Sequence, residues 1–367
     1  MYHQIFTIPA DFNINTLEVF CTHNNARRIK IKEVYGSLKN DDYGSGRRGF
    51  DFSYINQNTF EEYIKKCIEL GIDFNYTLNA SCMGNIEFDR QAREKFLSYV
   101  ESLYQLGIKC FTVAVPSVAQ LLGEHFSEIK ITLSIIAGIE NLDQIRMYVK
   151  FPYIKNVYIH EKINRNLQLV KAIADIANAN DVAVGTIVNL LCMTNCPFRQ
   201  FHYNHTAHMT QPEKYSAKEY YAYICLKEKI QDVRYLINAS WFRPEDIQRY
   251  IDAGVSRFKV AGRERIAQNA QYDKVVDIYN SGKYEGNILS LLTSFAKSSL
   301  EKAVNIPNGA ELDGFLKDIF TRQNICNQFG CTNCNRCQDV LNSIIINSEY
   351  ANRCIEDCDL GLSMFST

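Results

Sequence analysis

The sequence lacks an apolar run of membrane-spanning length. Its first residues, MYHQIFTIPADFNIN, also lack the basic, apolar and small-residue order of a secretion signal. We therefore expect a cytoplasmic protein that does not enter a membrane. A charge excess is missing too, because 40 basic residues are balanced by 41 acidic ones. This balance predicts no overall attraction to nucleic acid, although it leaves a local basic patch open.

Familiar hydrolase motifs are missing as well. The sequence contains no H-E-x-x-H zinc motif and no recognisable arrangement of a serine or cysteine nucleophile. Internal repeats and low-complexity segments are also absent. The 367 residues, 46% of them hydrophobic and 22% charged, are typical of a globular protein with one large domain and an appendage, or with two ordinary domains.

Short β-branched runs alternate with longer amphipathic segments from residue 28 to about residue 282. Expected strands cover residues 28–36, 73–80, 109–115, 130–136, 156–161, 182–191, 233–240 and 256–262. The segments between them have apolar residues at three-to-four spacing, and several end at a glycine, as a left-handed helix cap requires. Eight such units favour a closed (β/α)8 barrel of the TIM type, an α/β fold, over an open doubly wound sheet. We assign residues 1–282 to the barrel and residues 283–367 to a helical, cysteine-rich C-terminal extension that binds metal.

Polar residues gather just after the expected strands, where the active sites of such barrels lie. This asymmetry favours an enzyme over a scaffold. Each arginine there could be a plain surface charge, but together they indicate a substrate with an anionic group, because Arg matches carboxylate and phosphate bidentately. The arginines in question are Arg47, Arg48, Arg199, Arg243, Arg263 and Arg265.

Nine of the 13 cysteines lie after residue 190. In a cytoplasmic chain such clustering is more easily explained by metal ligation than by disulfides. The tightest group has the form C-x4-C-x2-C-x2-C and suits either zinc or an iron-sulfur cluster. It consists of Cys326, Cys331, Cys334 and Cys337. A last pair, Cys354 and Cys358, could be ligands or bystanders.

A second group of ligands lies in NLLCMTNCPFRQFHYNHTAHM, residues 189–209. Cys192 and Cys196 follow the sixth expected strand at the catalytic rim, and Cys225 in the next helix is the nearest later cysteine. Cys225 could equally be a core residue of that helix. Three thiolates suit a 4Fe-4S cluster, completed by a fourth ligand or left with one iron open to substrate.

Three histidines follow Arg199 at every third position: His202, His205 and His208. A zinc site made of Cys192, Cys196 and two of these histidines is one interpretation. His-rich loops at a barrel mouth more often bind substrate or move protons, so we expect the histidines to be catalytic together with Arg199.

Three motifs are similar to those of the peptidase U32 family: VYGS with the later GRRG, VNLLCMTNC, and WFRPEDIQRYIDAGVSRFKVAGR. The resemblance covers about residues 28–265. The family is named for a protease activity, but its branches in oxygen-independent ubiquinone synthesis and in prephenate-dependent RNA hydroxylation resemble hydroxylases with a 4Fe-4S cluster on four cysteines. The resemblance thus implies a barrel with a cluster at its mouth.

Matched to that family, Cys192 corresponds to the first cluster cysteine, Cys196 to the second, and Cys225 is the best match to the third. The interval C-x3-C is shorter than the usual one, and no cysteine follows Cys225 before the C-terminal group, so the fourth ligand is not identified. A subset with the pattern C-x3-CPFR-x2-H resembles this chain more closely.

Three functions follow as hypotheses. The first is an iron-sulfur oxidoreductase or hydroxylase-like enzyme acting on an anionic small molecule, peptide or RNA, with one or two 4Fe-4S clusters or with zinc at the C-terminal cysteines. The second is a metal-dependent peptidase, in which Glu161 or Glu245 would be the general base. The third is a partner-dependent role, in which the C-terminal cysteine segment binds a protein, a peptide or RNA.

Overall fold

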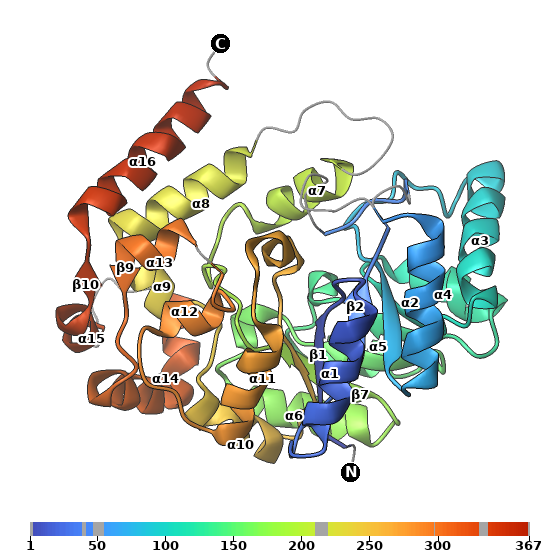
Figure 1. The fold of residues 1–367 in the computed structure, drawn as a ribbon, viewed down its shortest axis with the longest axis horizontal. Coiled ribbons are helices and arrows are strands. Elements are labelled where there is room, and N and C mark those ends of the chain that lie inside the picture. Colours follow the sequence, from blue (N-terminus) through green and yellow to red (C-terminus); the bar gives the residue numbers. More distant parts are fainter. Residues whose placement is uncertain are drawn as a thin grey trace.

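Eight strands form one closed, entirely parallel barrel in sequence order, with β1 hydrogen-bonded to both β2 and β8 (Figure 1). The computed structural model describes residues 3–38, 42–46, 55–209, 219–296, 298–329 and 337–365, with only the backbone described at 321–329 and 339. The predicted (β/α)8 barrel is confirmed. Its strands are β1 (Ile5–Pro9), β2 (Lys30–Gly36), β3 (Asp73–Leu78), β4 (Cys110–Val113), β5 (Lys130–Leu133), β6 (Ile154–Tyr158), β7 (Ala183–Ile187) and β8 (Arg257–Lys259).

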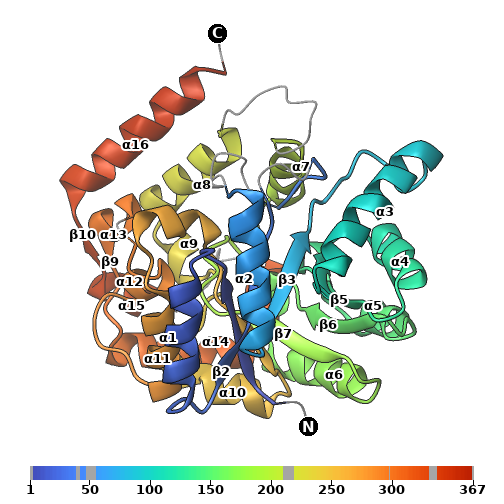
Figure 2. The same cartoon turned by 45° about the vertical axis from the view of Figure 1, so that its right-hand side comes forward.

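Helices cover the outside of the barrel (Figure 2). Asn56 and Asp89 accept backbone N–H groups at the starts of α2 and α3, which explains where these helices begin. The single helices between strands, and the one after β8, are α1 (Ile14–Asn24), α2 (Gln57–Glu69), α3 (Arg90–Gln105), α4 (Pro116–His125), α5 (Leu142–Tyr148), α6 (Leu167–Asn178) and α11 (Tyr272–Ser281). The long β7–β8 connection carries α7 (Arg199–Met209), α8 (Tyr220–Gln231), α9 (Arg234–Ile237) and α10 (Ile247–Asp252).

One observed strand was not predicted, and one predicted strand is a helix. The predicted number of eight barrel strands was therefore still right. The sequence IFTIP forms β1, a strand of five residues that we did not predict, because it precedes residue 28, where the predicted alternation begins. The expected strand at 233–240 is instead α9 and the turn after it. Its buried residues, Val233, Leu236 and Ile237, have helical spacing, and the Asp232 carboxylate accepts the backbone N–H of Arg234 at 3.0 Å.

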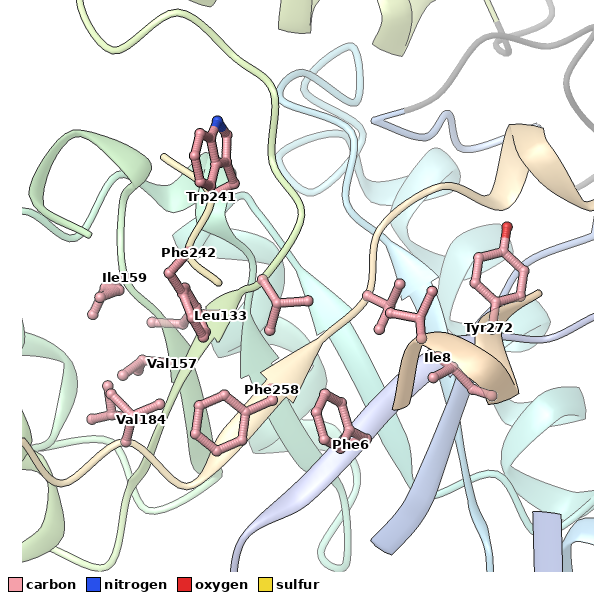
Figure 3. Close-up of a cluster of buried hydrophobic side chains, with 14 of the residues drawn as sticks. Phe6, Ile8, Leu133, Val157, Ile159, Val184, Trp241, Phe242, Phe258 and Tyr272 are labelled. Atoms are coloured by element: carbon pink, nitrogen blue, oxygen red, sulfur yellow. The ribbon is translucent and has the colours of Figure 1, made fainter. Parts of the chain in front are cut away.

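Alternate residues of the strands face outward and pack against the helices. The rings of Phe6 and Phe258 lie 5.8 Å apart between centroids, and Phe6 also contacts Tyr279 of α11 at 6.0 Å. Figure 3 shows these two phenylalanines in a row with Val184, with Phe242 above the row, and all four are buried. The hydrophobic core therefore lies between the barrel and its helices.

The inside of the barrel is polar. Tyr158 of β6 donates a hydrogen bond to Thr7 of β1 at 3.4 Å, and Asn75 of β3 donates one to Thr132 of β5 at 3.3 Å. Because neither pair of strands is adjacent, both bonds cross the barrel interior. Buried polar groups that are hydrogen-bonded to one another fix their positions, so this network makes a rigid floor for the barrel mouth.

The chain after α11 adds α12 (Ile288–Leu292), α13 (Ser299–Ala303), β9 (Val304–Asn305), α14 (Ala310–Phe329), α15 (Gln338–Ser343), β10 (Ile345–Ile346) and α16 (Ser348–Ser363). β9 and β10 form a two-stranded antiparallel sheet.

The last of these helices packs on the barrel's own helices. In both ribbon views α16 runs along α8 (Figures 1 and 2), and Lys227 of α8 forms an ion pair with Asp359 of α16. The division into two domains at residue 282 stays a prediction. Among the described residues, no helix is both long and apolar enough to span a bilayer.

Candidate functional site

A cavity of about 460 Å³ opens at the carboxyl ends of the barrel strands. Its floor includes residues of several strands, among them Tyr35 of β2, Thr112 of β4 and Lys259 of β8. Helices α7 and α8 provide the upper wall. A volume of this size suits a small molecule or a single residue of a larger one.

The three cysteines predicted as cluster ligands all line this cavity. Cys192 and Cys196 follow β7, and Cys225 lies on the face of α8 that also presents Tyr221 to the cavity. Burial, helped by the nearby charge of Glu161, raises the pKa of Cys192 to about 12. The thiol is therefore protonated at neutral pH, and binding of a metal there would have to release that proton.

The distances between the three sulfur atoms bear on whether a single zinc ion would bind all of them. In the part of the chain that the structure describes, the sulfur atoms of Cys192, Cys196 and Cys225 do not all lie within 4.8 Å of one another. Thiolates on one zinc ion, each bound at about 2.3 Å, lie within roughly 4 Å of one another. A 4Fe-4S cluster distributes its cysteines over different irons and accepts a wider spacing. As described, the three thiols therefore do not form a ready-made site for a single zinc ion, and the metal that they bind stays a prediction.

Arg199 lies at the cavity but is held by protein groups. Its Nε is 2.5 Å from Oε1 of Glu161, and its two terminal nitrogens donate to the carbonyls of Met193 and Thr194. Burial alone would lower the pKa of Arg199, but the charge of Glu161 raises it above its ordinary value. Tyr203 also donates to Oε1 of Glu161, at 3.2 Å.

The three predicted histidines lie on a helix, α7, where we expected a loop. Only His202 belongs to the described lining of the cavity, and its ring stacks on Tyr221 with centroids 5.7 Å apart. His205 meets the same ring edge-on, also at 5.7 Å. Positions three residues apart on a helix drift around its axis, which explains why His208 is not part of the described lining either.

Two of the five cationic residues in the described lining of the cavity, Lys259 and Arg263, lie at or just after the end of β8, and Lys259 was not predicted. Arg263 donates to Thr77 at 2.6 Å and to Ser37 at 3.2 Å. Nζ of Lys259 lies 3.7 Å from the centre of the Tyr35 ring. The signal for Lys259 was present in SRFKVAG, where charged residues at 257 and 259 alternate with apolar ones at 258 and 260 in a barrel strand.

Arg243, predicted to bind substrate, lies elsewhere. It is buried and pairs with Asp246, with 3.1 Å between Nε and Oδ2, and with Asp313 of α14. It is absent from the described lining of the cavity. The sequence could not reveal this, because the partner Asp313 lies 70 residues further along the chain. Arg47 and Arg48 lie outside the described residues.

The C-terminal cysteines are described only in part. Cys337 is half-buried, with its sulfur 3.8 Å from the side-chain nitrogen of Asn238. Cys331, Cys334 and the side chain of Cys326 lie outside the described part of the chain. Cys354 and Cys358 are buried on α16 and do not belong to the described lining of the cavity.

Comparisons with known proteins agree with this architecture. The model of the family described as "Peptidase family U32" matches residues 22–305. The "Uncharacterized protease MJ1657" of Methanocaldococcus jannaschii is 23% identical over 352 residues, covering 90% of this chain and 96% of that protein. The solved structure of "the U32 Peptidase Mk0906" is similar in fold, with a TM-score of 0.51, 14% identity, and coverage of 71% of this chain and 93% of that one. The chain belongs to peptidase family U32.

Proposed function

We propose that this protein is an iron-sulfur-dependent modifying enzyme with oxidoreductase or hydroxylase-like chemistry, acting in the cytoplasm on a substrate that carries an anionic group. The observation that supports the proposal most is the composition of one cavity. Cys192, Cys196 and Cys225 lie on its rim, while Lys259 and Arg263 lie on its floor.

In this proposal, Cys192, Cys196 and Cys225 hold the cluster, and the fourth ligand is still to be found. A bound 4Fe-4S cluster supplies one-electron chemistry. The other roles fall to the protein. Lys259 and Arg263 bind the anionic group of the substrate and so orient it below the rim. His202, which lines the same cavity, moves a proton.

The peptidase hypothesis is supported by the names of the family and of its relatives. The geometry of its two candidate bases offers no further support. Glu161 is buried and paired with Arg199. Glu245 accepts hydrogen bonds from the Tyr284 backbone at 2.9 Å and from Asn308 at 3.0 Å. Neither belongs to the described lining of the cavity, where an activated water would have to lie.

The deciding experiment is anaerobic purification and reconstitution with iron and sulfide, followed by metal analysis and spectroscopy. We expect a brown protein with about four or more irons per chain, as a 4Fe-4S cluster requires. Cys192→Ala should lose the cavity cluster, and Cys331→Ala should show whether the C-terminal cysteines hold a second metal. Cys67→Ala is the control, because Cys67 is a buried core residue of α2.

A colourless protein that holds only zinc would contradict the proposal. Peptide cleavage that survives iron removal but stops on zinc chelation would favour the peptidase.

A further inference from the structure

The loop that carries two of the three cavity thiols is clamped from both sides. From the cavity side, Arg199 donates to the carbonyls of Met193 and Thr194, the two residues that follow Cys192. From the other side, the Thr194 hydroxyl donates to the backbone carbonyl of Asn238. The path of the backbone between Cys192 and Cys196 is therefore set by groups outside that segment.

The clamp is anchored on the neighbouring strand connection. Glu161 follows β6, and its Oε1 accepts from both Arg199 and Tyr203. The Ser240 hydroxyl in turn donates to the backbone carbonyl of Glu161 at 2.7 Å. Arg199 thus connects the segment after β6 to the loop after β7 that carries Cys192 and Cys196.

Arg199 and Glu161 each occupy a position that is unfavourable for their charge when the other is absent. The Glu161 side chain has no exposed surface, and an unpaired buried carboxylate is costly. Arg199 is the first residue of α7, where the helix dipole disfavours a cation. Each charge offsets the cost of the other, so loss of either should release the loop.

We propose that Arg199 and Glu161 are positioning residues that hold the Cys192–Cys196 loop in the conformation that binds the metal centre. This revises the catalytic role predicted for Arg199, because three of its five N–H donors bind Glu161 and two carbonyls. The inference rests on the proposed function for the identity of the metal centre. The effect of the clamp on the loop can be measured without metal, as the rate at which Cys192 and Cys196 are alkylated.

The test uses the full chain with Arg199→Lys, which keeps the charge but cannot reach three acceptors at once, and Glu161→Gln, which keeps the shape but removes the charge. Arg27→Lys is the matched control. The Arg27 side chain is 2% exposed, against 13% for Arg199, and it pairs with Asp273 and Asp277, but Arg27 precedes β2 at the opposite end of the barrel.

Two quantities are measured for each variant. One is the rate at which Cys192 and Cys196 of the metal-free protein are alkylated, resolved by peptide mass spectrometry and compared with the stability of the whole fold. The other is the retention of iron by the reconstituted protein against a chelator. We expect Arg199→Lys and Glu161→Gln to raise the alkylation rates about tenfold and to weaken iron retention about 10- to 100-fold, as for other groups that orient ligands.

Arg27→Lys should lower stability comparably and change neither readout. The Arg199→Lys/Glu161→Gln double variant should be no worse than the more severe single variant, because both remove one interaction. If the charge variants do not fold, Tyr203→Phe, which removes one hydrogen bond to Glu161, should still raise alkylation at least twofold.

Alkylation rates equal to those of the wild type in a folded Arg199→Lys protein would overturn the inference, as would equal changes in Arg27→Lys. A wild type without iron would instead refute the proposed function and leave the alkylation result to decide the clamp.

Discussion

Gly361 of α16 packs directly against the ring of Tyr223 on α8, so closely that a methyl group at position 361 would overlap the ring atoms. The opposite face of α8 carries Cys225 and Tyr221 into the cavity. The last helix of the chain thus supports a wall of the candidate site. It lies beyond residue 305, where the match to the family model ends.

Gly361→Ala should therefore destabilise the fold. A helix normally gains about 1 kcal/mol from Gly→Ala, but overpacking typically costs about 1–3 kcal/mol. We expect a net loss of about 1 kcal/mol in the free energy of unfolding and faster alkylation of Cys225. Gly314→Ala is the control, since Gly314 of α14 is exposed with open space around it, and it should be neutral or stabilising. Equal effects of the two substitutions would contradict this packing.

Arg243→Met should destabilise the protein without affecting the cavity. The substitution leaves Asp246 buried, and among the described residues Arg249, at 3.4 Å, is its remaining ion-pair partner. Breaking a buried pair from one side costs about 3–5 kcal/mol, which chemical denaturation would measure. Asp313→Asn should cost less than about 1 kcal/mol, because Asp313 is exposed. A loss of ligand binding with unchanged stability would instead restore the predicted role of Arg243 in substrate binding.

The fold was readable from the sequence because the alternation of strands and helices is a local pattern. The prediction missed the short strand IFTIP, and it failed for VRYLINAS, a short segment that suits both states and in which the contact between Asp232 and the Arg234 backbone favours helix. That Cys192 and Cys196 bind metal stays a prediction, but their place at the cavity was readable because they directly follow a strand. The roles of the arginines were not, since Arg199 and Arg243 are defined by partners that come together only in the folded chain.

Asp232 should stabilise the start of α9 in a pH-dependent way. Its hydrogen bonds from the Arg234 side chain hold its pKa below the ordinary value of 3.8. A carboxyl with a lowered pKa contributes stability above its unfolded pKa and loses it as the pH falls through the folded value. Asp232→Ala should thus cost about 1 kcal/mol at pH 7, as for other hydrogen bonds, and less below pH 4.

Asp232→Asn keeps an oxygen that can accept the Arg234 backbone N–H and should lose less than Asp232→Ala. Unfolding curves at pH 7 and pH 3 measure both. A stability difference between wild type and Asp232→Ala that grows toward acid pH would contradict stabilisation by the ionised carboxylate.

Lys259 should be required for binding of anionic ligands. Its ammonium lies 3.7 Å from the centre of the Tyr35 ring, and the guanidinium of Arg263 lies 5.5 Å from the same ring, so a ligand on the cavity floor meets both cations. Thermal unfolding in a panel of carboxylates and phosphates, at constant ionic strength, should reveal a stabilising ligand. At 100 times its dissociation constant, such a ligand stabilises by about 2.7 kcal/mol.

Lys259→Met should abolish most of that stabilisation, and Lys259→Arg should retain part of it because the charge is kept. Lys109→Met is the matched control. Lys109 also lies over a tyrosine ring, at 3.1 Å from the centre of Tyr104, but just before β4 at the far end of the barrel. Because screening by salt acts on both lysines, a loss of the ligand effect in Lys259→Met alone would locate the anion on the cavity floor. An equal loss in Lys109→Met would mean that the anions act on the protein surface as a whole.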